Sequence, residues 1–159
     1  WRLEADRMRR RNLNVMHSSN RMLQDTSVLA SIILGILVFA GPSVLGFFLG
    51  QAIVAIIQLE TVNYIEHYGL YRKKIDLNQY EKQNSSHSWN SSHRISNWSL
   101  FNLPRHADHH NYAGRPYHLL RHEAEAPQLP AGYSAMMILA TVPFLWRRIM
   151  DPRVKTIML

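Results

Sequence analysis

Cysteine is absent from this sequence of 159 residues, and its absence excludes two classes of structure. Without thiols the chain can form neither a disulfide framework nor a metal site with thiolate ligands. The sequence also lacks internal repeats, a glycine-rich phosphate-binding loop and a serine-nucleophile motif. Its metal-binding side chains are therefore imidazoles and carboxylates, and nine histidines are present.

Charged side chains are absent from residues 26–59, between Asp25 and Glu60. As one straight helix this stretch would be roughly 50 Å long, well beyond the roughly 30 Å of a bilayer's hydrocarbon core. The pair Gly41-Pro42 interrupts the stretch near its middle, and such a pair breaks helices. Two spans joined as a hairpin would satisfy this pattern, and so would one tilted and kinked helix.

The charges around the stretch decide between these two arrangements. Arginines crowd its N-terminal side, basic residues at 72–74 follow its C-terminal side, and the break in the middle carries no charge. Because positive residues favour the cytoplasmic face, both flanks are expected in the cytoplasm, which requires an even number of crossings. We therefore predict a transmembrane helical hairpin over residues 26–66, with spans near 26–40 and 43–62, rather than the core hairpin of a soluble protein.

Basic residues predominate in the rest of the chain, with 18 Lys and Arg against 11 Asp and Glu and a formal charge of +7. Such a balance suits nucleic acid, an anionic membrane surface or an acidic protein partner. The apolar stretch favours the last two, and nucleic acid is not expected as a partner. Residues 1–25 contain six arginines and are predicted to be a solvated, amphipathic segment at the cytoplasmic face, in contact with lipid headgroups.

Residues 67–159 are predicted to form a cytoplasmic cap that belongs to the same larger domain as the hairpin. Within it, residues 71–83 are charged and expected at the surface, whereas residues 84–99 contain enough His and Trp to predict a packed loop. Residues 133–146 are apolar but short, which predicts an interfacial or core helix. The predicted fold class is therefore all-α: a membrane protein with a transmembrane helical hairpin and a helical cap.

Three histidines of the cap, His106, His109 and His110, stand at positions i, i+3 and i+4. These positions share one face of a helix. Pro104 suits the first turn of such a helix, and Asn102 is a candidate N-cap. Three imidazoles converging from one face can bind iron, copper, nickel or zinc. A solvated, histidine-rich helix face is the alternative, and a further histidine at the end of the apolar stretch counts against it.

That further histidine is His67, which lies where the second predicted span ends. Glu60, Asn63 and His67 stand at i, i+3 and i+7, so they form one stripe of a helix for which Gly69 is the expected stop. Burying polar groups at the end of a membrane helix costs free energy, so such groups often have a functional role. The alternative is that their side chains extend to the polar membrane interface and have no such role. We predict that His67 is a metal ligand and that Glu60 and Asn63 orient it.

His118 and His122 are a competing pair of metal ligands, spaced i and i+4. Arg121 lies between them, and the surrounding residues are typical of a soluble surface. These features predict a surface helix rather than a metal site.

The stretch Asn63-Tyr64-Ile65-Glu66-His67-Tyr68-Gly69-Leu70 resembles the signature of the membrane-bound alkane 1-monooxygenases. The stretches His87-Ser88-Trp89-Asn90-Ser91 and Arg105-His106-Ala107-Asp108-His109-His110 resemble the next two blocks of that family, in the same order and spacing. Residues 133–154 resemble its C-terminal region, so the resemblance covers nearly the whole chain. The xylene monooxygenase hydroxylase subunit is a close relative with similar blocks.

The resemblance implies a multi-pass, non-haem diiron enzyme of the bacterial inner membrane whose metal site faces the cytoplasm. Such an enzyme hydroxylates the terminal methyl group of medium-chain n-alkanes to 1-alkanols with O2. It receives electrons from NADH through a rubredoxin reductase and rubredoxin. The iron ligands carried over to this chain are His67, His106, His109 and His110. The groups expected around these ligands are Glu60, Asn63, Glu66, His87 and Asp108, and no catalytic residue beyond the ligands is expected.

The family also has two earlier histidine boxes, and no counterpart precedes His67, since His17 stands alone. We therefore expect the chain to be the C-terminal half of such an enzyme and to be inactive by itself. One alternative is a related membrane enzyme with other chemistry, either aromatic methyl hydroxylation or fatty-acid desaturation or hydroxylation. The other is a non-catalytic membrane protein that binds a metal or an acidic partner. The sequence Glu66-His67-Tyr68-Gly69 favours hydroxylation.

Overall fold

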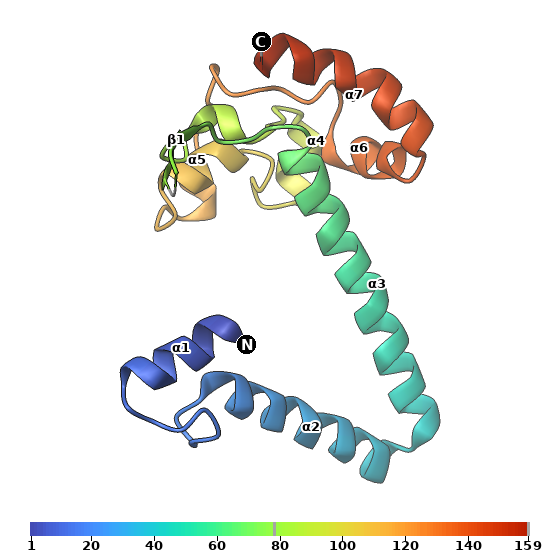
Figure 1. Ribbon diagram of the computed structural model, residues 1–159. Helices are drawn as coiled ribbons and strands as arrows, with labels where there is room; N and C mark the ends of the chain where they lie inside the picture. Colours follow the sequence, from blue (N-terminus) through green and yellow to red (C-terminus); the bar gives the residue numbers. More distant parts are fainter. Residues whose placement is uncertain (78, 159) are drawn as a thin grey trace. The chain divides into compact units, whose positions relative to one another are not determined.

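The computed structural model describes residues 1–77 and 79–158, and it is mostly helical (Figure 1). Its α-helices are α1 (Arg2–Arg10), α2 (Arg21–Ala40), α3 (Pro42–His67), α4 (Arg94–Ser99), α5 (His106–Asn111), α6 (Tyr133–Ala140) and α7 (Pro143–Met158). Single 3-10 turns are η1 (Ser85–His87) and η2 (Tyr117–Leu119), and β1 (Lys74–Asp76) pairs antiparallel with β2 (Gln79–Tyr80). The predicted helical fold class is confirmed. The chain divides into two compact units, Trp1–Ala55 and Ile56–Leu159.

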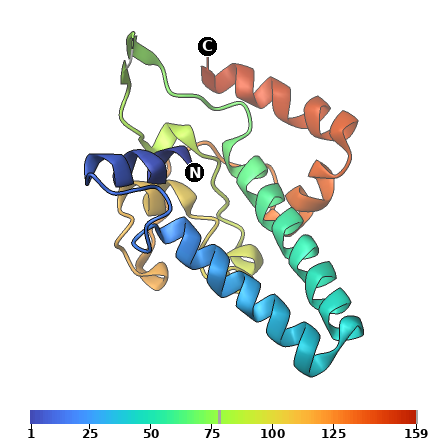
Figure 2. The same ribbon diagram turned by 60° about the horizontal axis from the view of Figure 1, so that its bottom comes forward.

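The break between α2 and α3 lies at Gly41, as predicted (Figure 2). Gly41 has a φ of +87°, a conformation that glycine adopts at little cost. Pro42 is the first residue of α3, where a missing N–H costs no hydrogen bond. Both helices are long and apolar enough to cross a membrane, and most of their apolar side chains are exposed. This is the surface expected of a helical hairpin that lies in lipid.

The first unit begins with α1, which is hydrogen-bonded to the start of α2. The carboxylate of Glu4 pairs with Arg7 and accepts the backbone N–H of Arg21 at 2.7 Å. The side chain of Asn20 caps α2 by accepting the N–H of Leu23 at 3.3 Å. These bonds satisfy N–H groups that have no partner within the helix itself.

The core of the second unit lies where the C-terminal end of α3 packs against α6 and α7 (Figures 1 and 2). Its fully buried residues are Ile65, Trp89, Leu129, Tyr133, Met136, Trp146 and Met150. The rings of Tyr64 and Tyr68 lie 5.3 and 5.2 Å from that of Trp146. Gly69 follows α3 with a φ of +70°, and a Cβ there would lie 2.7 Å from the Val154 side chain. Glycine therefore allows both the end of α3 and the close approach of α7.

Several local predictions are wrong in detail. His118 lies in the 3-10 turn η2, which ends at Leu119, so His118 and His122 do not share a helix. Asn102 does not cap α5, because it has a φ of +58° and its side chain donates to the carbonyl of Tyr117, while Arg105 occupies the cap position. The short β1–β2 ribbon was not predicted.

Candidate metal centre

Helix α5 has only six residues, and it depends on contacts from outside the helix. The side-chain oxygen of Asn90 accepts the backbone N–H of Ala107 at 2.8 Å, which satisfies a first-turn donor. Asp108 is fully buried, pairs with Arg115 and accepts the backbone N–H of Arg121 at 2.8 Å. Two adjacent residues in the first turn of the helix are thus attached to two different loops. This attachment fixes the direction in which its histidines point.

Three imidazoles meet where α5 passes the end of α3. Nε2 of His106 lies 3.3 Å from Nε2 of His67 and 2.7 Å from Nε2 of His110. One ligand nitrogen from each of the three lies within 4.8 Å of the others. His106 is buried, and the other two rings are partly buried. His67 from α3 and the pair His106 and His110 from α5, separated by a long stretch of chain, are therefore brought close together.

His109, the fourth predicted ligand, is not part of this group. Its ring centroid lies 6.1 Å from that of His106 and 5.9 Å from that of His110. His106 and His110 are one turn apart at i and i+4, while His109 projects from the same short helix at a different angle. The structure therefore brings together three of the four predicted ligands.

The three imidazoles fit a transition metal by spacing. Nitrogen ligands lie about 2.1 Å from a bound transition metal. At the nitrogen–metal–nitrogen angles of octahedral to tetrahedral sites, two such nitrogens lie about 3.0–3.4 Å apart. The separation of 3.3 Å falls in that range. The separation of 2.7 Å is slightly shorter and also accommodates an N–H···N hydrogen bond between the two rings.

The same imidazoles fit a metal by protonation state. Burial, followed by the nearby imidazoles of His110, His67 and His109, lowers the pKa of His106 to about 3. Burial likewise lowers the pKa of His110. Both rings are therefore neutral at neutral pH, and neutral imidazole is the form that binds metals.

Two of the three rings have an acceptor beside their other nitrogen. Nδ1 of His67 lies 3.3 Å from the backbone carbonyl oxygen of His87. Nδ1 of His106 lies 3.3 Å from Oε1 of Glu66, although the two are not aligned as a hydrogen bond. Such acceptors hold the proton on Nδ1 and leave Nε2 free for a metal.

The groups predicted around the ligands occupy different positions. Glu66 contacts His106, as described above. His87 reaches His67 only through its carbonyl, because its ring lies 3.0 Å from a Glu81 carboxylate oxygen and accepts the backbone N–H of Asn84 at 3.0 Å. Asp108 contacts the Arg115 side chain and the loop at Arg121.

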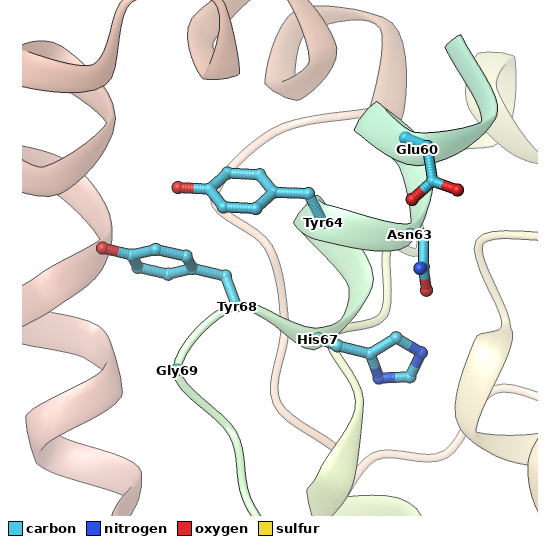
Figure 3. Close-up of a pocket in the computed structure, with 6 residues that line it drawn as sticks. All are labelled: Glu60, Asn63, Tyr64, His67, Tyr68 and Gly69. Atoms are coloured by element: carbon cyan, nitrogen blue, oxygen red, sulfur yellow. The ribbon is translucent and has the colours of Figure 1, made fainter. Parts of the chain in front are cut away.

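Glu60 and Asn63 lie on the same side of α3 as His67, which is the predicted stripe (Figure 3). Together with Tyr64, Tyr68 and Gly69 these residues line an open cavity of about 440 Å³. In Figure 3 the two tyrosines point away from the stripe, toward α7. Glu60 and Asn63 therefore border His67 at this cavity and are in position to contact whatever occupies it.

Sequence reasoning missed the residues that join the two ligand-bearing helices. In segment 87–90, Trp89 donates its backbone N–H to Glu66 O at 2.7 Å and its indole N–H to Tyr68 O at 2.8 Å. The density of aromatic residues in 84–99 indicated packing but not these partners. The hydroxyl of Tyr133 donates to Glu66 across 67 residues of sequence, and no pattern along the chain indicates that contact.

The family comparison agrees with this arrangement. The family model described as fatty acid desaturase matches residues 2–140. The chain belongs to the fatty acid desaturase family. Two long apolar helices together with this family membership make it a membrane protein.

Within that family the chain is similar to alkane 1-monooxygenases, which confirms the resemblance inferred from sequence. It is 46% identical to alkane 1-monooxygenase 2 of Pseudomonas aeruginosa and 43% identical to alkane 1-monooxygenase 2 of Alcanivorax borkumensis, each over 155 residues. Both alignments cover 98% of this chain and 41% of the relative. The xylene/toluene monooxygenase hydroxylase component of Pseudomonas putida is 30% identical over 91% of the chain and 38% of that relative. The chain thus spans about two fifths of the length of the relatives it matches.

Asp108 is expected to carry much of the stability of α5. Replacement by Ala leaves Arg115 without its partner at a site where Asp108 is fully buried, and should lower the free energy of unfolding by about 3 kcal/mol. The matched control is Asp6→Ala, which removes an exposed pair with Arg9 at 3.5 Å and should cost less than about 1 kcal/mol. Thermal unfolding of the detergent-solubilised protein measures both. Equal, small shifts in the two variants would contradict the anchoring role of Asp108.

Proposed function

We propose that this chain carries part of the metal centre of a membrane-bound alkane 1-monooxygenase, which converts medium-chain n-alkanes to 1-alkanols with O2. The observation that carries the proposal is the convergence of three imidazole nitrogens at the end of an apolar helix. The identities of 39–46% to alkane 1-monooxygenases, against 30% to the xylene/toluene enzyme, favour alkane over aromatic substrates.

The proposed metal is iron, in a non-haem centre of two ions, with His67, His106, His109 and His110 as the ligands from this chain. Bound iron would supply the activation of O2 that an unactivated C–H bond requires. The residues of this chain hold the ligands in place, and burial keeps His106 and His110 neutral. The remaining ligands are proposed to come from parts of the protein outside this sequence, so that the chain alone would be inactive.

The position of the centre suits a substrate that dissolves in lipid. α3 presents exposed apolar side chains along most of its length and reaches the histidines at its C-terminal end. An alkane could therefore approach from the hydrocarbon region without crossing water. The polar side chains of Glu60 and Asn63 lie only at the end of this apolar surface, beside His67, where they line the cavity.

Two alternatives stay open beside this proposal. Aromatic methyl hydroxylation, or fatty-acid desaturation or hydroxylation, would use the same histidines on a different substrate. Product analysis with octane, xylene and a fatty acid offered separately to the intact enzyme distinguishes them. A non-catalytic, metal-binding membrane protein would bind iron and yield none of these products.

Single alanine substitutions in the intact enzyme test the ligands. His67→Ala, His106→Ala and His110→Ala should each remove bound iron and alkane hydroxylation, because each deletes a nitrogen from the converging group. His109→Ala should do the same if it binds as proposed. His118→Ala is the matched control, since His118 is exposed in a 3-10 turn, and it should retain both iron and activity. Iron analysis and 1-octanol formation are the measurements. Loss in the control equal to that in the three variants would overturn the assignment.

We further propose a bacterial inner-membrane location with the metal centre on the cytoplasmic side. The charge pattern supports it, because exposed basic residues precede the apolar hairpin in α1 and follow it in β1, so both of its sequence flanks are basic.

Cysteine labelling tests this topology. Because the sequence has no cysteine, only an introduced cysteine can react with the reagent. Single cysteines at Arg10 and Lys74 should both be protected from a membrane-impermeant reagent in intact cells and both react after lysis. A cysteine at Ser43, beside the break, should react in intact cells. If only one of the two flanks were labelled from outside, the chain would cross once and the hairpin topology would be wrong.

The proposed electron donor is a rubredoxin reduced through NADH. Its docking surface is proposed to include the exposed side chains of Arg72, Lys73 and Lys74 beside the β ribbon. Rubredoxins as a class are small and acidic, and complementary charge accelerates encounter. Arg105 contributes less to this surface, because its guanidinium donates to the carbonyl of Leu120.

Charge reversal tests the donor surface. Lys73→Glu with Lys74→Glu should lower kcat/KM for reduced rubredoxin severalfold at low salt and flatten its dependence on ionic strength, because screening acts over about 8–10 Å. Turnover driven by a small chemical reductant should persist. The control is Arg10→Glu with Arg11→Glu, which changes the net charge equally at residues that are not part of the proposed surface. Equal losses with both electron sources would show that the lysines act on the fold instead.

A further inference from the structure

Tyr133 is fully buried at the start of α6, and its hydroxyl lies 3.2 Å from Oε1 of Glu66. The same oxygen lies 3.3 Å from Nδ1 of His106. One carboxylate oxygen therefore accepts a tyrosine hydroxyl from α6 and lies within ion-pairing distance of an imidazole nitrogen on α5. These three side chains come from three separate helices, all within the second compact unit.

The direction of the hydrogen bond follows from the chemistry of the phenol. A tyrosine hydroxyl has one proton, and the acceptors within reach are Glu66 Oε1 at 3.2 Å and the carbonyl oxygen of Trp89 at 3.4 Å. The carboxylate is the nearer and the more strongly accepting of the two. Tyr133 therefore donates to Glu66 and restrains the carboxylate beside His106.

Glu66 has an unusual electrostatic environment. It is 4% exposed, and among the described residues no Arg or Lys lies within ion-pairing distance of its carboxylate. A buried carboxylate without a cation is unfavourable. A metal bound at Nε2 of His106 would place positive charge on the far side of that ring and its proton on Nδ1. Glu66 Oε1 lies 3.3 Å from that nitrogen, although the two are not aligned as a hydrogen bond, and His106 Nδ1 is otherwise without a partner among the described residues.

We propose that Tyr133 is a positioning residue for the metal centre. Through Glu66 it fixes the tautomer and the orientation of His106, so that Nε2 faces His67 and His110. This inference rests on the metal site of the proposed function and adds to it a residue that never touches a ligand. Groups that orient metal ligands in this way commonly change metal affinity by about 10- to 100-fold.

A purely structural role for Tyr133 predicts a different outcome. Its ring belongs to the same core as Met136 and Trp146, and Phe would fill that space equally well. Tyr133→Phe therefore removes only the hydroxyl. Tyr68→Phe is the matched control, because Tyr68 also donates to a carboxylate, Asp151, at 2.6 Å, and Asp151 does not contact a histidine.

The experiment measures metal binding in the intact, purified membrane enzyme loaded with Fe²⁺ or Co²⁺. Tyr133→Phe should release metal to a chelator at least about 10-fold faster than wild type and should shift the visible absorption of the Co²⁺ form. Tyr68→Phe should leave the release rate and the spectrum unchanged. Each variant should lower the unfolding temperature of the metal-free protein by a similar, small amount, since each loses one hydrogen bond.

A double-mutant cycle tests whether Tyr133 acts through Glu66. Glu66→Gln should weaken metal binding at least as much as Tyr133→Phe, and the double variant should be no weaker than Glu66→Gln alone. Independent, multiplying effects would overturn the proposal. So would a wild-type release rate and spectrum in Tyr133→Phe, or equal changes in Tyr133→Phe and Tyr68→Phe. If the metal-release rates and spectra of wild type and variants differ as expected but the intact enzyme hydroxylates no alkane, the proposed function is wrong. The positioning role of Tyr133 would still hold in that case.

Discussion

Segment 87–90 joins the two helices that carry the converging histidines, and the geometry of the site depends on it. Trp89 bonds to backbone carbonyls on either side of His67, while Asn90 satisfies an N–H at the start of α5. The carbonyl of His87 lies against the ring of His67 itself. Because these peptide groups are shielded from water, leaving them unpaired would be costly, so the bonds hold α3 and α5 in one relative position. A three-histidine site requires that fixed position.

The second constraint is that this junction buries polar and ionisable groups beside an apolar hairpin. Glu66, His106 and Asp108 are all buried there, whereas most apolar residues of α2 and α3 are exposed. Over the hairpin this is the reverse of a soluble protein, in which apolar side chains are inside, whereas the second unit keeps an apolar core of its own. Lipid around the hairpin accounts for the apolar surface, and the neutral imidazoles of His106 and His110 beside His67 suit a metal ligand set. Both features follow from one location, the end of a membrane helix.

Prediction from the sequence succeeded where the cause was local. The charge-free stretch and Gly41-Pro42 predicted two helices with a break at Gly41, because helix length and proline chemistry act within a few residues. The stripe of Glu60, Asn63 and His67 was likewise predicted from helical spacing, since α3 continues through all three. The i and i+4 spacing of His106 and His110 placed their rings on one face of α5.

Prediction failed where a distant contact decided the backbone. The spacing of His118 and His122 suggested a helix, but the peptide N–H of Arg121 is held by Asp108, thirteen residues earlier. Asn102 had the right chemistry for a cap, yet its side chain bonds to Tyr117. In both cases a tertiary hydrogen bond outweighed a local preference, which contributes only about 1 kcal/mol.

The sequence by itself determined the class of fold, the break in the hairpin and the residues able to bind a metal, because periodicity and charge are properties of neighbouring residues. Only the tertiary structure decided that His67, His106 and His110 converge while His109 stands apart. It also decided that Tyr133 meets Glu66 across 67 residues of sequence. The physical reason is that helical spacing relates residues only within a turn or two. Contacts between α3, α5 and α6 depend on how buried side chains such as Trp89 and Tyr133 fill the space among the helices.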